Sequence, residues 1–251
     1  FSNDKAVKLL RGKTGTVVQV AVQRDSRSLG TLSLTRSEVQ PPSVTFKMLP
    51  QSIGYIFINA FGRETPQEFN VALDRLEQGG AKAYVLDLRN NGGGYVDSAL
   101  DISEHFINSD PLLVVKERGK QTTQIDAENL AIPAKPLTVL VNRYTASASE
   151  IMSGALQDDG VGVLVGEKTF GKGVMQTLSP LPDGAAIKIT TAHYLTPKNR
   201  DINLKGIVPD MVVTENKDAR FGELQRDAQL QAAVTVINKK IAEASGTAGA
   251  N

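Results

Sequence analysis

The chain has 251 residues, and its 41% apolar content is enough to bury the core of one large domain with a small appendage. Its 28 Lys and Arg residues against 27 Asp and Glu leave a net charge of +1, which provides no overall field for nucleic acid or an anionic membrane. The lack of cysteine excludes disulfides, thiolate metal sites and a cysteine nucleophile, and no apolar run approaches the roughly 20 residues of a membrane-spanning helix.

The beginning of the chain predicts a short helix and two strands, and a Pro41-Pro42 pair then interrupts the pattern. A buried strand and an amphipathic helix follow, and Pro66 marks the first turn of that helix. The predicted ranges are a helix over 4–11, strands over 16–22, 31–34 and 53–58, and a helix over 65–78.

The rest of the chain alternates strands with helices and becomes rich in strands toward its end. This alternation favours a mixed α/β core. The predicted strands cover 83–88, 112–116, 137–141, 161–165, 174–178, 186–194 and 208–213, and the predicted helices cover 96–106, 147–156 and 221–244.

Two segments supply candidate catalytic groups: small residues crowd around Ser147, and glycines flank Lys172. A serine hydroxyl needs a neighbouring base to attack a carbonyl group. A lysine serves as that base only when it is neutral, which requires its pKa to fall from about 10.4 to roughly 7–8. Burial among apolar groups has this effect, and we expect Phe170 and Val174 to exclude water from Lys172. The pair therefore predicts a serine/lysine hydrolase.

Several motifs follow one another along nearly the whole chain, and each of them is typical of one protease family. They are Leu9-Leu10-Arg11-Gly12, Leu34-Thr35-Arg36, Ile53-Gly54-Tyr55-Ile56, Leu86-Asp87-Leu88-Arg89-Asn90-Asn91-Gly92-Gly93-Gly94, Ser147-Ala148-Ser149-Glu150, Gly166-Glu167-Lys168-Thr169-Phe170-Gly171-Lys172-Gly173 and Gly206-Ile207-Val208-Pro209-Asp210. The chain resembles the carboxyl-terminal processing proteases, also called tail-specific proteases. The resemblance implies a crotonase-like α/β catalytic core with a PDZ domain before it.

The resemblance also implies a domain organisation and a setting. Residues 1–36 are similar to only the second half of a PDZ domain, so we expect an incomplete PDZ-like domain there. The catalytic core is expected over 37–218, and an amphipathic helix with a disordered tail over 219–251. The implied substrates are proteins with exposed C-terminal tails, the implied location is outside the cytoplasm, and no metal or cofactor is implied.

By resemblance Ser147 is the nucleophile and Lys172 the base. If a strand continues from Lys172, alternation places Gln176 on the same face, where it can hydrogen-bond the lysine amine. A serine at a helix start offers the free amide of Ala148 to an oxyanion, and by resemblance Gly93 offers a second.

Asp158 also matches a family position. A carboxylate against the lysine would raise its pKa and oppose catalysis, so we interpret Asp158 as a structural acceptor near the end of the serine helix.

Three alternatives stay open. The segment from Gly166 to Gly173 is one residue away from a phosphate-binding P-loop, although a strand is predicted after it instead of a helix. His105 and His193 permit a Ser-His-Asp triad, although both fit structural positions better. A third hypothesis is a non-catalytic or latent module that binds protein tails.

Overall fold

The computed structural model describes residues 3–24, 27–38, 41–108, 111–128, 131–182, 185–216 and 218–247. The chain divides into two compact units, Phe1–Pro41 and Pro42–Asn251. The first unit contains helix α1 (Asn3–Leu10) and an antiparallel hairpin of β1 (Val17–Arg24) and β2 (Arg27–Thr35).

Arg36 joins the helix of this first unit to its hairpin. Its Nε donates to the carbonyl of Leu10 and its guanidinium also donates to Thr16 Oγ1, both at 2.8 Å. None of the unit's described side chains is fully buried. The unit thus has hydrogen bonds that join its elements but no enclosed apolar core in its described part, and its assignment to a PDZ-like domain stays a prediction.

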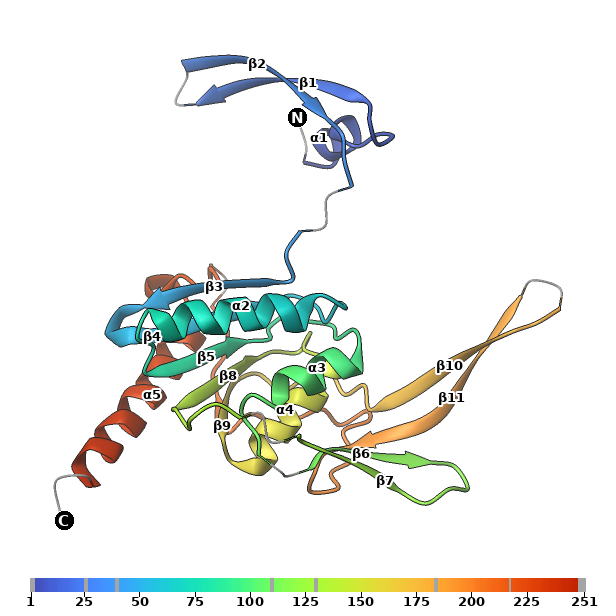
Figure 1. Ribbon diagram of the computed structural model, residues 1–251, viewed down its shortest axis with the longest axis vertical. Coiled ribbons are helices and arrows are strands. Elements are labelled where there is room, and N and C mark those ends of the chain that lie inside the picture. Colours follow the sequence, from blue (N-terminus) through green and yellow to red (C-terminus); the bar gives the residue numbers. More distant parts are fainter. Residues whose placement is uncertain are drawn as a thin grey trace. The chain divides into compact units, whose positions relative to one another are not determined.

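The second unit is built around a six-stranded sheet in the order β12-β9-β8-β5-β4-β3 (Figure 1). Its strands pair in parallel except for β3, which runs antiparallel to β4 at one edge. The strands are β3 (Val44–Leu49), β4 (Ile53–Ile58), β5 (Ala83–Asp87), β8 (Leu137–Val141), β9 (Gly162–Gly166) and β12 (Met211–Val212).

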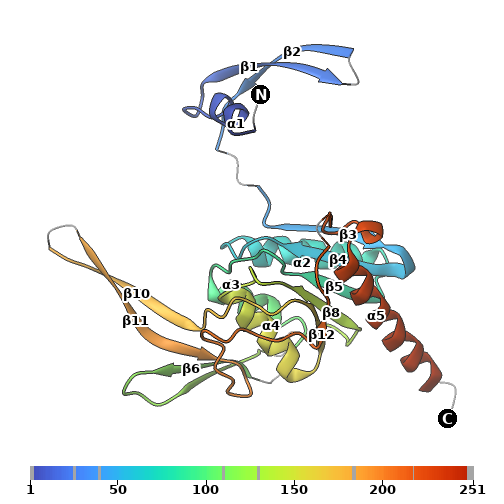
Figure 2. The ribbon, with the colours of Figure 1, turned by 180° about the vertical axis from the view of Figure 1, so that it is seen from behind.

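Helices cover both faces of this sheet. On one face lie α2 (Thr65–Gln78), α3 (Val96–Ser103) and α4 (Ala148–Asp159), and α5 (Ala228–Thr247) crosses the other face (Figures 1 and 2). Strand side chains alternate between the two cores, as Tyr84 packs with the three-helix side and Val85 packs with α5. The near-continuous apolar strands of the sequence are explained by this double covering.

A separate antiparallel sheet has the order β10-β11-β6-β7. Its strands are β6 (Pro111–Glu117), β7 (Thr123–Asp126), β10 (Val174–Pro180) and β11 (Ala186–Leu195), and two short 3-10 turns cover Pro50–Ser52 and Leu224–Arg226. Strands β10 and β11 project from the core as a twisted ribbon (Figure 1). The strand β10 that forms part of this ribbon begins two residues after Lys172.

The predicted mixed α/β core is confirmed, with differences at particular elements. Strands β3 and β7 fall where no strand was predicted, and β12 is shorter than the predicted 208–213. The C-terminal helix begins at Ala228 and not near Phe221, because Asp227 accepts a hydrogen bond from Leu230 N at 2.9 Å and so caps it. Residues 248–251 of the predicted disordered tail lie outside the described residues.

Candidate active site

Ser147 lies at the junction between the loop after β8 and helix α4. Its backbone has φ 58° and ψ −121°, a left-handed conformation that is costly for a residue with a side chain. The loop before it is attached to the loop after β5, since Ala146 N donates to the carbonyl of Asn91 at 3.0 Å. Two strand ends of the parallel sheet therefore hold the serine in a strained turn at a helix N-terminus.

Gly93 lies directly against this turn. A methyl group added at Gly93 would lie 2.8 Å from Ser147 Cβ and 3.0 Å from Ala148 N, and the φ of Gly93 is +98°. Only glycine fits such an approach without displacing its neighbours. Gly93 N donates to Asn91 Oδ1 at 2.9 Å, so this amide is already hydrogen-bonded in the structure. The sequence-predicted group of Gly93, Ser147 and Ala148 is brought together.

Glu150 joins the serine segment to the lysine segment. Its side chain is fully buried, and its carboxylate accepts hydrogen bonds from Ser147 N (3.0 Å), Thr169 Oγ1 (2.5 Å), Gly171 N (2.7 Å) and Lys172 N (2.8 Å). The Ser147 and Lys172 amides bond the same oxygen, Oε2. Segments 25 positions apart are therefore held by one carboxylate, a role that the sequence analysis missed.

Lys172 is exposed, and so is Phe170, so the expected burial of the lysine among apolar groups is wrong for this structure. The reason lies in the glycines around it. A methyl group at Gly171 would lie 2.8 Å from Gly206 N, and one at Gly173 would lie 2.7 Å from Asn203 N. The loop packs through its glycine backbone against residues 203–206, which leaves the larger side chains on the solvent side.

Gln176 lies on β10, is exposed, and follows Val174 in the same strand. In the part of the chain that the structure describes, no hydrogen bond joins Gln176 to Lys172. The predicted hydrogen bond between Gln176 and the lysine amine is therefore not formed in the described part of the chain.

Asp158 lies near the end of α4 and is buried. It accepts a hydrogen bond from Lys198 N at 2.8 Å and pairs with Arg200 at 2.5 Å. These contacts attach α4 to the loop after β11, away from the Glu150 anchor.

The histidines have structural surroundings. His105 hydrogen-bonds Asn70 at 2.6 Å and stacks on Phe69, and burial lowers its pKa. His193 lies within β11, opposite Lys116 and Val174. Strand β10 follows the Gly-Lys-Gly segment where a P-loop requires a helix. Neither the triad nor the nucleotide-binding alternative gains support from this geometry.

A buried ion-pair network supports the loop that carries Gly93. The Arg89 guanidinium is fully buried and pairs with Asp87 at 2.6 Å and with Asp227 at 2.7 Å. These ion pairs raise the pKa of Arg89 although burial opposes its charge. Asp87 and Arg89 belong to one of the sequence motifs, but no role was predicted for either residue.

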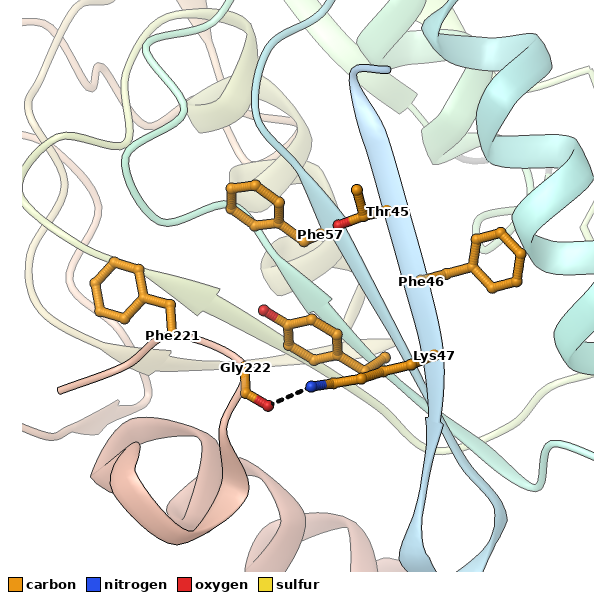
Figure 3. A pocket seen from close by; sticks show the side chains of 7 residues that line it. Thr45, Phe46, Lys47, Phe57, Phe221 and Gly222 are labelled. Carbon is orange, nitrogen blue, oxygen red and sulfur yellow. Dashed lines mark hydrogen bonds between the residues drawn. The ribbon is translucent and has the colours of Figure 1, made fainter. Parts of the chain in front are cut away.

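The ring of Phe221 covers the Arg89 guanidinium at 4.0 Å. Phe221 also borders a cavity of about 310 Å³ beside β3 and β4, where Lys47 Nζ donates to the carbonyl of Gly222 at 2.7 Å (Figure 3). Neither Ser147 nor Lys172 lines this cavity, so we take the Glu150 junction as the candidate active site.

Among the described residues, no cluster of three His, Cys, Asp or Glu side chains is placed to hold a metal ion. Nor does that part of the chain contain a helix long and apolar enough to span a membrane.

Comparison with known proteins agrees with this geometry. The family model described as Peptidase family S41 matches residues 52–213. A carboxyl-terminal-processing protease of Picosynechococcus is 38% identical over 242 residues, which is 94% of this chain and 58% of the relative. The carboxy-terminal processing protease CtpA of Bacillus subtilis is 36% identical over 241 residues, 96% of this chain and 52% of the relative.

Solved structures give the same result. The photosystem II D1 C-terminal processing protease superposes with a TM-score of 0.63 at 33% identity, over 84% of this chain and 58% of that one. A Bacteroides fragilis protein at 21% identity has a TM-score of 0.68 over 95% of this chain and 70% of that one, and shows the fold alone. The chain spans somewhat more than half the length of its curated relatives. The predicted resemblance is confirmed: the chain belongs to peptidase family S41.

Proposed function

We propose that this chain carries the catalytic core of a serine peptidase of the carboxyl-terminal processing type, with Ser147 as nucleophile and Lys172 as base. The observation that carries the proposal is the Glu150 carboxylate, whose single oxygen Oε2 accepts the backbone amides of both residues. Such a shared anchor keeps two segments that are distant in sequence beside each other, as a two-residue catalytic pair needs.

The proposed reaction passes through an acyl-enzyme. Ser147 Oγ attacks the scissile carbonyl while Lys172 takes the hydroxyl proton, and Lys172 then gives that proton to the departing amine. Water hydrolyses the resulting ester. The Ala148 amide at the N-terminus of α4 and the Gly93 amide stabilise the oxyanion, which requires Gly93 N to leave Asn91 Oδ1.

Substrate binding completes the site in this proposal. Lys172 is exposed in the free protein, so a bound polypeptide supplies the exclusion of water that a neutral lysine requires. Gln176 orients the lysine amine once the substrate is in place, and Asp158 keeps its structural role at the end of α4.

The proposed substrates are proteins with exposed C-terminal tails. The support comes from the relatives, which are named for carboxyl-terminal processing. The relation to these proteases also underlies the proposed extracytoplasmic location. The PDZ-like assignment of the first unit belongs to the same proposal, because a PDZ groove recognises chain ends.

The test is cleavage of an unfolded protein with a short apolar C-terminal tail, with the products identified by mass. We expect Ser147→Ala and Lys172→Ala to abolish cleavage, and Lys172→Arg to fail too because arginine stays charged. Lys168→Ala is the matched control, since Lys168 is an exposed lysine of the same segment. Cleavage that persists in Lys172→Ala would exclude the serine/lysine pair.

A latent or non-catalytic tail-binding module is the second candidate. It is favoured by the exposed Lys172 and by the Gly93 amide that already bonds Asn91. Binding of the tail peptide without cleavage, equal in the parent and in Ser147→Ala, would support this candidate.

A further inference from the structure

The chemistry of the proposed reaction assigns a side of the site to the departing tail. This inference rests on the proposed function. Lys172 donates its proton to the leaving amine, so the first residues after the scissile bond must pass beside Lys172. Side chains that surround the lysine segment are therefore positioned to contact the tail, and those on the far side of Ser147 contact the acyl half.

Two large apolar residues with exposed side chains either belong to the lysine segment or are hydrogen-bonded to its backbone. Phe170, which is 64% exposed, precedes the lysine by two residues, and its amide donates to the carbonyl of Thr145 at 3.0 Å. Leu204 is 89% exposed, and its amide donates to the carbonyl of Gly171 at 2.8 Å. These hydrogen bonds fix both residues beside the segment that holds Lys172.

Leu204 is unfavourable in two independent ways. Its φ is +59°, in the left-handed region that asparagine or glycine tolerates better than leucine. Its side chain is also left almost entirely in water, which gains nothing in the free protein. Strained backbone of this kind is characteristic of functional sites.

We propose that Phe170 and Leu204 bind an apolar side chain of the departing tail, within the first two residues after the scissile bond. The occupant follows from the surface, because two exposed apolar side chains gain free energy only when an apolar group covers them. The peptidase would thereby select proteins by the chemistry of the fragment that it releases.

The experiment uses three substrates with one acyl half. Two are peptides that carry leucine or serine at the first two tail positions, and the third is the methyl ester of the acyl half, which has no tail side chain. The parent should cleave the leucine peptide with a kcat/KM roughly tenfold above that of the serine peptide, as is typical for one apolar contact. Cleavage of all three should be lost in Ser147→Ala.

Two variants test the assignment. Leu204→Asn removes the apolar group and suits a φ of +59°, so the unfolding midpoint should be unchanged or higher. Phe170→Ser removes the aromatic ring. Each should reduce the preference for leucine over serine several-fold and leave kcat/KM on the methyl ester, which has no tail, at the parent value. Val212→Asn is the control, because Val212 is 69% exposed on β12 and should leave the preference intact.

The outcomes separate the two proposals. A parent that cleaves the methyl ester through Ser147 but shows no preference between the tails would overturn this inference and keep the proposed function. A Leu204→Asn variant that retains the parent's preference for leucine would also overturn this inference and keep the proposed function. So would a variant whose kcat/KM falls equally on all three substrates. Absence of Ser147-dependent cleavage of every substrate would overturn both.

Discussion

At the scale of single residues, Glu150 holds the candidate site together, because it joins the segments of the two proposed catalytic residues. Its carboxylate accepts four hydrogen bonds in a fully buried position, and all four donors belong to the serine and lysine segments. An ionised carboxylate only accepts hydrogen bonds, and its two oxygens have enough lone pairs for the four donors. The residue acts through Ser147 and Lys172, and we regard it as a positioning residue.

Glu150→Gln tests this role. The amide keeps one acceptor oxygen and turns an NH₂ donor toward backbone N–H groups, leaving buried donors unpaired. We expect a loss of about 2–4 kcal/mol in the free energy of unfolding, measured in urea. We also expect kcat to fall more than KM rises, because both segments lose their shared anchor. Unchanged kcat in a folded Glu150→Gln variant would contradict the positioning role.

The glycine loop offers a matched pair of substitutions. Gly93→Ala adds a methyl group 2.8 Å from Ser147 Cβ at a φ of +98°, so it must displace the serine turn. Its neighbour Gly92 has no atom within 4 Å of the same added group. We expect Gly93→Ala to lower kcat by at least about 100-fold, the cost of losing an oxyanion donor, and Gly92→Ala to stay near the parent. Equal effects of the two would exclude a special place for Gly93.

Part of the site could be predicted from the sequence, and part of it depends on the tertiary fold. Ser147 and Lys172 are recognisable because their flanking residues are unusual. The spacing of Ser147 and Glu150 is that of a capping box, so one hydrogen bond of Glu150 was predictable. Its bonds to residues 169–172 depend on the tertiary fold. The expected burial of Lys172 was wrong, because composition does not reveal which side of a loop packs inward.

At the scale of elements, the Arg89 network connects the end of β5 to the start of α5. The Asp227 carboxylate accepts hydrogen bonds from both terminal nitrogens of Arg89 and from the backbone amides of Gly222 and Leu230. Burial disfavours the charge of Asp227, but its hydrogen bonds with Arg89 outweigh that cost and lower its pKa. The network thus stabilises the strand end from which the Gly93 loop departs.

Asp227→Asn leaves the Arg89 charge with one carboxylate partner, and we expect it to cost about 3–5 kcal/mol at pH 7. Because the folded pKa of Asp227 lies below the unfolded value of about 3.9, its contribution is complete above that value. That contribution is lost as pH falls through the folded pKa. The free energies of unfolding of parent and variant, measured in urea between pH 7 and pH 3, should therefore differ less at the acid end. A difference in the free energy of unfolding that stays constant with pH would contradict the contribution assigned to ionised Asp227.

The elements that were missed differ in how much signal they carried. The segment of β3 alternates apolar and polar residues from Val44 to Met48, so its strand was predictable from the period of two. Strand β7 is exposed along its whole length and carries no such alternation. It forms a strand because the backbone of β6 beside it pairs with it in an antiparallel ladder. Apolar periodicity therefore predicts the strands that enclose the core and misses those that only extend a sheet.

At the scale of the whole molecule, the two units differ in what stabilises them. Both apolar clusters are built from residues numbered 44 and above, so the core lies in Pro42–Asn251. Glu150, Arg89 and the partners described for them belong to that unit as well. The proposed chemistry and the proposed choice of tail through Phe170 and Leu204 therefore reside in one unit.

Removal of residues 1–41 tests this division. We expect the remaining chain to unfold cooperatively in urea with the midpoint of the parent's main transition, because both apolar clusters are kept. On short peptides, its kcat/KM and its preference for an apolar tail should match the parent, since the proposed catalytic and tail-contacting residues remain. On unfolded proteins it should lose the part of the affinity that the first unit supplies. A shortened chain that folds with the parent's midpoint but loses activity on short peptides would show that residues 1–41 complete the site.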